Sequence, residues 1–145
     1  MTASAPNTTT LLTVDSVGTD IVVEIRRGVG APLVIVPGVM ADAATWRPVV
    51  DHIDLPNPVA TVNRRGRQPS GPLEQGYSVG TEIADLRRVI DALGGDVHLF
   101  GWSYGALIAL ETATQQDGIR SLGAYEPVAG PFGADAVPPL SLIHI

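Results

Sequence analysis

Hydrophobic residues along the chain follow two spacings, one typical of strands and one typical of helices. The runs LLTVDSV (11–17) and DIVVEIRR (20–27) are rich in β-branched residues and flank Gly18, which predicts a hairpin. Two shorter apolar runs, PLVIVPG (32–38) and PVATVN (58–63), have no polar face. Runs of that kind are typical of strands that are buried on both sides, as in a parallel sheet.

Helical spacing separates these strands. In ATWRPVVDHI (44–53) and SVGTEIADLRRVIDAL (78–93) apolar residues recur three or four positions apart, and Gly94 fits the C-terminal cap of the second helix. ALIALETATQQ (106–116) predicts a third, mostly buried helix. The remaining predicted strands are DVHLFG (96–101) and SLGAYEP (121–127). This alternation predicts an α/β fold with a doubly wound, mostly parallel sheet after an N-terminal antiparallel hairpin.

Composition narrows the class of protein. The 145 residues suffice for one domain with a sizeable core, and the net charge of −6 argues against nucleic acid as a partner. With no cysteine, disulfides and thiolate nucleophiles are excluded. No segment has the pattern of a secretory signal or the length of about 20 apolar residues that a membrane span needs. We therefore expect a cytoplasmic protein with no membrane partner.

One segment carries the chemistry. In HLFGWSYGALIAL (98–110), Gly101, Ser103 and Gly105 match the pattern G-x-S-x-G between two apolar runs. The pattern predicts a strand-to-helix turn so tight that its neighbours must be small, with the serine hydroxyl exposed at the carboxyl edge of the sheet. The alternative is a glycine-rich turn without chemistry, as any doubly wound fold can contain.

Three segments together resemble the α/β-hydrolase family. They are PGVMADAATW (37–46), NRRGRQPSG (63–71) and, as the specific part, the elbow GWSYG (101–105). The resemblance covers about residues 20 to 130. It implies a truncated α/β-hydrolase fold in the serine hydrolase branch, because the epoxide and haloalkane branches carry aspartate at the elbow.

The resemblance also implies roles for named residues. Ser103 would be the nucleophile, and the backbone N–H groups of Val39 and Tyr104 would form the oxyanion hole. Such donors meet charge that develops in the transition state, and losing one costs about 100- to 1,000-fold in rate. A serine hydroxyl also needs a base, and the family supplies the acid and then a histidine after the serine in chain order.

The base is harder to place than the nucleophile. His52 follows the first helical pattern and is interpreted as a surface residue, and His98 as a packed, hydrogen-bonded strand residue at the wrong end of its strand. Chain order alone favours His144. For the acid, Glu126 at the end of the last strand is a candidate, although a bracing role is favoured, and Asp135 has no supporting context.

The end of the chain argues against His144. Its last six residues, LSLIHI (140–145), match the in-frame translation of CTGTCTCTTATACACATC, a transposon-end sequence used in DNA library preparation. We therefore expect residues 1–139 to be the N-terminal part of one α/β-hydrolase domain and residues 140–145 to be an adapter-derived tail. The triad histidine, and with it the acid, would then lie beyond this fragment, which alone would be inactive.

The other features favour no second function. Arg64, Arg65 and Arg67 are expected in a solvated loop, with phosphate binding or a contact to substrate as the alternatives. Gly-Val-Gly at 28–30 is only the start of the nucleotide-binding pattern G-x-G-x-x-G and precedes no predicted helix, so no nucleotide cofactor is expected. The sequence contains no cluster of residues with metal-ligand spacing. Two tryptophans are expected in the core or a pocket wall, namely Trp46 and Trp102.

The sequence thus predicts a cofactor-free serine hydrolase that acts on an ester-like carbonyl of a small molecule through an acyl-enzyme. The alternative is a relative with the same fold and no hydrolytic activity: a lyase, a peroxidase-like enzyme or a ligand-binding protein. A histidine in the C-terminal part of the protein would favour the hydrolase.

Overall fold

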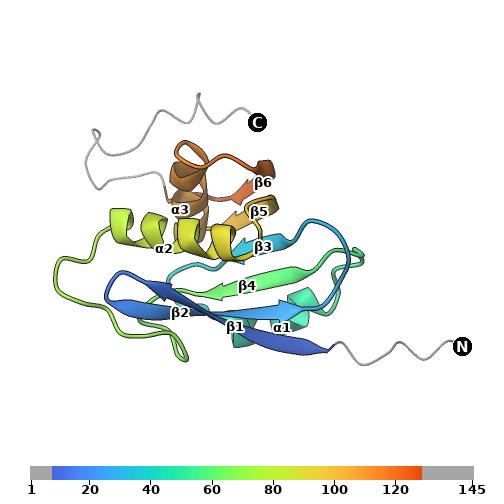
Figure 1. Cartoon of the computed structure of the whole chain (residues 1–145), viewed down its shortest axis with the longest axis horizontal. Helices are drawn as coiled ribbons and strands as arrows, with labels where there is room; N and C mark the ends of the chain where they lie inside the picture. Colours follow the sequence, from blue (N-terminus) through green and yellow to red (C-terminus); the bar gives the residue numbers. More distant parts are fainter. Residues whose placement is uncertain (1–7, 129–145) are drawn as a thin grey trace, which may run out of the picture.

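The computed structural model describes residues 8–128, which form a six-stranded mixed sheet and three helices (Figure 1). The strands are β1 (Thr9–Ser16), β2 (Thr19–Arg26), β3 (Leu33–Val36), β4 (Val59–Asn63), β5 (Val97–Trp102) and β6 (Ile119–Tyr125). The helices are α1 (Ala43–Val50), α2 (Val79–Ala92) and α3 (Tyr104–Ala113). Within the described ranges no helix is long and apolar enough to cross a membrane.

The strand order confirms the predicted architecture. The order across the sheet is β1-β2-β4-β3-β5-β6, in which β1, β2 and β4 pair antiparallel and β4, β3, β5 and β6 run parallel. The parallel strands end at the same edge of the sheet, because parallel neighbours share a direction. The loops that follow β3, β4 and β5 therefore meet at this carboxyl edge, although they are far apart in the sequence.

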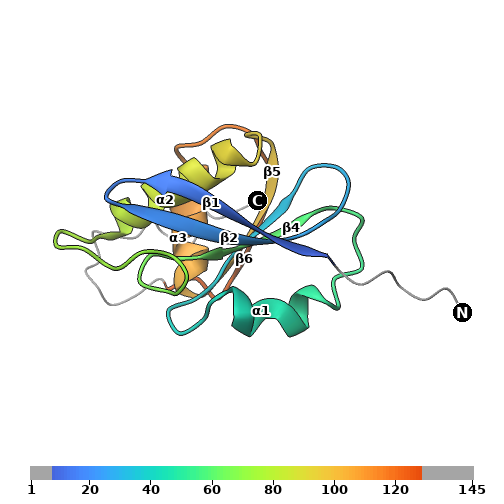
Figure 2. The ribbon, with the colours of Figure 1, turned by 60° about the horizontal axis from the view of Figure 1, so that its bottom comes forward.

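Each face of the sheet is covered by helices. Figure 2 shows α1 on one side of the sheet and α2 with α3 on the other. The larger core lies under α2 and α3, where Leu86, Val89 and Ile108 pack against the strands. A smaller core lies under α1 and includes Ile35, Val50 and Val59. Because strands β3 and β4 contribute to both cores, their sequences are apolar throughout rather than alternating.

Several predicted boundaries shift, among them both ends of α3 (predicted over 106–116) and the start of β6 (predicted at 121). Two other shifts have a local reason. The first helix ends at Val50 rather than at residue 53, because His52 and Ile53 donate backbone hydrogen bonds three residues back and form a turn. It begins at a capping box, in which the Asp42 carboxylate accepts from Thr45 N at 2.8 Å. The hydrogen bonds from Thr45 lower the pKa of Asp42 below its ordinary value of 3.8. The last strand ends at Tyr125, because Glu126 has a φ of 43°.

Candidate active site

The turn between β5 and α3 has a strained backbone at its serine. Ser103 has φ 56° and ψ −116°, a backbone conformation that residues other than glycine rarely adopt. Its N–H donates to the carbonyl oxygen of Tyr125 at 2.9 Å, and α3 begins at the next residue, Tyr104. A strained backbone persists only where the surrounding structure holds it, and such residues cluster at functional sites.

Close backbone packing explains the two glycines of the elbow. A Cβ on Gly101 would lie 2.5 Å from Cα of Ala106 and would overlap the carbonyl oxygen of Gly105. A Cβ on Gly105 would overlap the carbonyl oxygen of Val36, at the end of β3. The glycines therefore let α3 pack directly against β3 and β5, which holds the turn at Ser103.

The loop after β3 lies beside this serine. A Cβ on Gly38 would be 3.5 Å from Cβ of Ser103 and 3.3 Å from the carbonyl oxygen of Trp102. The next residue, Val39, is half exposed. The structure thus brings the segment that contains Val39 to the elbow, and the first turn of α3, with Tyr104, starts there as well. The oxyanion roles of their N–H groups remain a prediction.

Glu126 is exposed, although the residue before it contacts the elbow. It follows Tyr125, whose carbonyl oxygen accepts the Ser103 N–H. Among the described residues its carboxylate has no hydrogen-bond or ion-pair partner. Its role as the acid stays untested.

Neither histidine of the described region lies at the elbow. His52 is exposed, and its Nδ1 lies 2.6 Å from the carbonyl oxygen of Pro48. His98 pairs with Leu33 at the start of β5, the end opposite to Ser103, and its Nδ1 bonds Ser121 Oγ at 2.7 Å. Both positions agree with the sequence interpretation. Asp135, His144 and the tail 140–145 lie outside the described residues.

The prediction of a solvated arginine loop is wrong for Arg64. Its side chain is 6% exposed and that of Glu82 is 3% exposed. Nη1 of Arg64 donates to Glu82 Oε1 at 2.7 Å, and Nη2 donates to the carbonyl oxygen of Gly38 at 2.9 Å. A buried guanidinium needs such partners, because removing its charge from water costs several kcal/mol. The loop after β4 thus begins with a buried side chain rather than a solvated one.

Arg65 contradicts the same prediction. It donates from Nε and Nη2 to the two oxygens of Asp85, each at 2.7 Å, and both side chains are almost completely buried. The hydrogen bonds to Asp85 raise the pKa of the Arg65 guanidinium, against the opposing effect of burial. Arg67 is half-buried, and its Nη1 lies 3.5 Å from the Gly66 carbonyl oxygen.

The side chains of two tyrosines, Tyr104 and the exposed Tyr77, join the Arg64–Glu82 pair. Sequence reasoning named Tyr104 only for its backbone N–H and missed both side-chain contacts. The Tyr77 hydroxyl donates to Glu82 Oε1 at 2.7 Å and lies 3.0 Å from the Tyr104 hydroxyl. Burial, followed by these hydrogen bonds, raises the pKa of Tyr77, so the hydroxyl stays protonated. The Arg64 guanidinium lies 5.1 Å from the centre of the Tyr104 ring. A signal was present: Glu82 and Asp85 fall on the apolar face of α2, where acids need partners.

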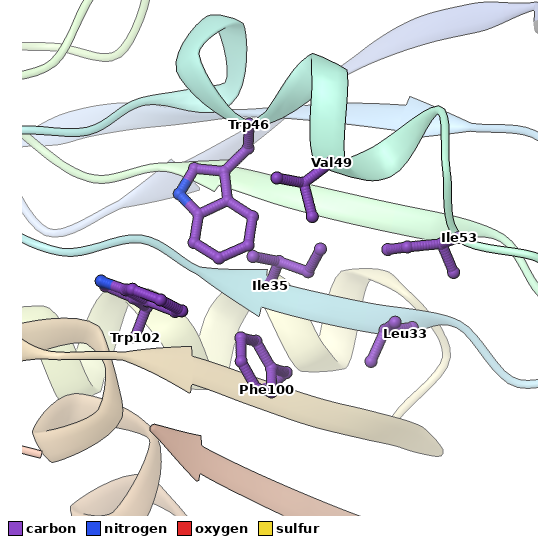
Figure 3. Close-up of a pocket in the computed structure, with 7 residues that line it drawn as sticks. All are labelled: Leu33, Ile35, Trp46, Val49, Ile53, Phe100 and Trp102. Atoms are coloured by element: carbon purple, nitrogen blue, oxygen red, sulfur yellow. The ribbon is translucent and has the colours of Figure 1, made fainter. Parts of the chain in front are cut away.

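An apolar pocket opens on the α1 side of the sheet. It has a volume of ≈ 450 Å³, and Figure 3 shows its lining side chains converging from α1, the turn after α1, β3 and β5: Leu33, Ile35, Trp46, Val49, Ile53, Phe100 and Trp102. The Trp102 ring stacks on Tyr125 with a centroid distance of 4.1 Å and meets Trp46 edge-on at 5.8 Å. Both tryptophans are therefore pocket-wall residues, as predicted.

Within residues 8–128, no group of three or more His, Cys, Asp or Glu side chains could hold a metal ion. The candidate site that the described residues form consists of the elbow, the Gly38 loop and the cluster of Arg64, Glu82, Tyr77 and Tyr104, which we call the arginine cluster.

Comparison with known proteins identifies the family of this fold. The sequence model of a family described as "Alpha/beta hydrolase family" matches residues 33–144. N-formylmaleamate deformylase from Pseudomonas putida is 36% identical over 109 residues, which are 72% of this chain and 40% of that protein.

Two solved structures are similar at more than 30% identity. An alpha/beta hydrolase from Sphaerobacter thermophilus is 36% identical, with a TM-score of 0.72 over 90% of this chain and 51% of that chain. The bottromycin epimerase BotH, solved in complex with bottromycin A2, is 31% identical, with a TM-score of 0.70 over 77% of this chain and 46% of that chain. The chain therefore spans about half the length of the proteins it matches.

Proposed function

Because the chain belongs to the alpha/beta hydrolase family, we propose that the full-length protein is a serine hydrolase with Ser103 as nucleophile. The observation that carries the proposal is the backbone of Ser103, held at φ 56° and ψ −116° between two glycines that have no space for a side chain. Strain of this kind costs about 1–3 kcal/mol and persists where the structure over-determines it, as at a nucleophile.

In the proposed reaction, Ser103 Oγ attacks the carbonyl carbon of the substrate while a base takes its proton. The oxygen that becomes negative accepts hydrogen bonds from the N–H groups of Val39 and Tyr104. The leaving group departs with the proton, and water then hydrolyses the acyl-enzyme and releases the free serine. Since His52 and His98 lie away from the elbow, we assign the base to a histidine outside the described residues.

We propose a small-molecule substrate with a carbonyl bonded to oxygen or nitrogen. The deformylase relative supports this class, because its name describes removal of a formyl group from an N-formyl compound. The apolar pocket does not enter this assignment, because Ser103 does not line it.

Replacement of Ser103 by alanine in the full-length protein tests the proposal. We expect hydrolysis of p-nitrophenyl acetate to fall at least about 1,000-fold, because the nucleophile is lost. A fluorophosphonate should label the wild-type protein on the peptide that contains Ser103, and mass spectrometry locates the added group. Unchanged hydrolysis in Ser103→Ala would refute the assignment.

A second function is favoured by one comparison. One similar protein, BotH, is named an epimerase and not a hydrolase. In that case the full-length protein would bind a small molecule at the same carboxyl edge without forming an acyl-enzyme. Wild-type protein that is folded, resists fluorophosphonate labelling and does not hydrolyse the ester would favour this alternative.

A further inference from the structure

The Gly38–Val39 peptide borders the proposed nucleophile, so its orientation matters. A Cβ on Gly38 would be 3.5 Å from Ser103 Cβ. Within residues 8–128 the one cis peptide bond is Gln68–Pro69, so the Gly38–Val39 bond is trans. In a trans peptide the C=O and the N–H point in opposite directions within one plane. A contact that holds the Gly38 carbonyl therefore also sets the direction of the Val39 N–H.

Arg64 makes the shorter of two such contacts, the other being the Ala41 N–H at 3.4 Å. Its Nη2 donates to the Gly38 carbonyl oxygen at 2.9 Å, across 26 residues of sequence. The donor carries a positive charge, which makes such a hydrogen bond roughly twice as strong as a neutral one. A cation on the carbonyl also polarises the peptide and makes its N–H a better donor, because linked hydrogen bonds strengthen one another.

The guanidinium itself is held from several sides. Glu82, in the first turn of α2, accepts from Nη1 at 2.7 Å and also accepts from the Tyr77 hydroxyl at 2.7 Å. The Tyr104 ring packs against the guanidinium, and its hydroxyl bonds that of Tyr77 at 3.0 Å. The buried Arg64 side chain thus contacts both segments that carry the proposed oxyanion donors. It bonds the carbonyl oxygen of the Gly38–Val39 peptide and packs against the Tyr104 ring.

We infer that Arg64 is a positioning residue, which orients and polarises the Gly38–Val39 peptide so that the Val39 N–H faces the developing oxyanion beside Ser103. This inference rests on the proposed function. Arg64 does not touch the substrate in this arrangement, and its effect on the rate passes through the peptide. Arg65, an equally buried arginine with an acid on the same helix, donates its hydrogen bonds to Asp85 and Val17 and none to the described residues of the Gly38 loop.

Matched double variants of the full-length protein test the inference. Arg64→Met/Glu82→Gln removes the pair that reaches Gly38 without leaving an unpaired buried charge, and Arg65→Met/Asp85→Asn removes the equally buried neighbouring pair. We expect the first variant to lower kcat for p-nitrophenyl acetate about 10- to 100-fold with KM within about threefold, because the donor is misaligned rather than lost. The fluorophosphonate labelling rate should fall by a similar factor.

The control pair should change kcat and the labelling rate less than about threefold. An equal loss in both double variants would mean that loosening of the loop, rather than orientation of the peptide, lowers the rate, and would overturn the inference. Wild-type rates in a folded Arg64→Met/Glu82→Gln protein would overturn it as well. If the wild-type protein is not labelled at Ser103, the proposed function fails instead, so the two failures are distinguishable.

A conservative variant covers the case in which the first double variant does not fold. Arg64→Lys keeps the positive charge beside Glu82 but lacks the planar fork that reaches two acceptors at once. We expect about a tenfold loss in kcat and in labelling rate, with KM again nearly unchanged. Wild-type kinetics in Arg64→Lys would contradict a role that requires simultaneous hydrogen bonds to Glu82 and to the Gly38 carbonyl oxygen.

Discussion

Two neighbouring regions at the carboxyl edge of the sheet differ in how they are built. The elbow at 101–105 is a backbone structure, in which glycines admit close approach and one strained serine connects a strand to a helix. The loop after β4, which begins at Arg64, is a side-chain structure that two buried ion pairs fasten to α2. The conformation of the elbow requires positions without a Cβ atom, whereas the conformation of the loop requires buried ion pairs.

This difference determines which substitutions each region tolerates. In the elbow an added methyl group is damaging, because its nearest neighbours would be backbone atoms that cannot rotate away. In the loop a change of size matters less than a change of charge, because a buried acid whose arginine is removed has no opposite charge beside it. Variants of Gly105, Arg65 and Ser103 separate steric effects in the elbow from charge effects in the loop, each with a control variant of the same protein.

The largest effect is expected at Gly105. Gly105→Ala places a Cβ against the carbonyl oxygens of Val36 and Pro37, so we expect the full-length protein to lose about 4 kcal/mol or more of its free energy of unfolding. Gly80 is the matched control, because it is likewise the second residue of a helix. There the nearest atom to an added Cβ is Ser78 Oγ, at 3.3 Å, which can rotate.

We expect Gly80→Ala to change stability by about 1 kcal/mol at most, with helix propensity favouring alanine. Urea denaturation of both variants measures the difference. Similar midpoints for the two would show that the elbow can relax around an extra methyl group.

The intermediate effect concerns the loop. Arg65→Met leaves Asp85 buried without its ion pair, so we expect a loss of about 3–5 kcal/mol in the free energy of unfolding. Arg67→Met should change it by about 0.5 kcal/mol or less, since that half-buried arginine has no ion pair within the described residues. Adding Asp85→Asn to Arg65→Met should recover part of the loss. A shift for Arg67→Met as large as that for Arg65→Met would contradict the assignment.

The smallest effect isolates the strain at the elbow. Ser103→Gly and Ser103→Ala both remove the hydroxyl, but only glycine adopts φ 56° without steric cost. We expect Ser103→Gly to be about 1 kcal/mol more stable than Ser103→Ala, since the relieved strain exceeds the greater entropy that glycine gives the unfolded chain. Thermal unfolding of both variants measures this difference. Equal stability would show that Ser103 stores no strain.

Much of the fold could be predicted because its signals are local. The apolar runs of β3 and β4 indicated strands that are buried on both sides, and the spacing in α2 indicated a helix with one buried face. The elbow was equally visible, since its glycines and serine lie within five consecutive residues and belong to one turn. The limits of α1 and β6 were less accurate, because turns and single positive φ values decide them.

The sequence by itself determined the order of strands and helices, the turn at Ser103 and membership of the predicted fold class. Only the tertiary structure decided that Arg64 and Arg65 are buried, because a guanidinium is buried only where hydrogen-bond acceptors reach it, and here acids from elsewhere in the chain do so. Glu82 and Asp85 lie 18 and 20 residues further along the chain. A local pattern describes the arginines and the acids separately, and the packing of α2 against the sheet brings them together.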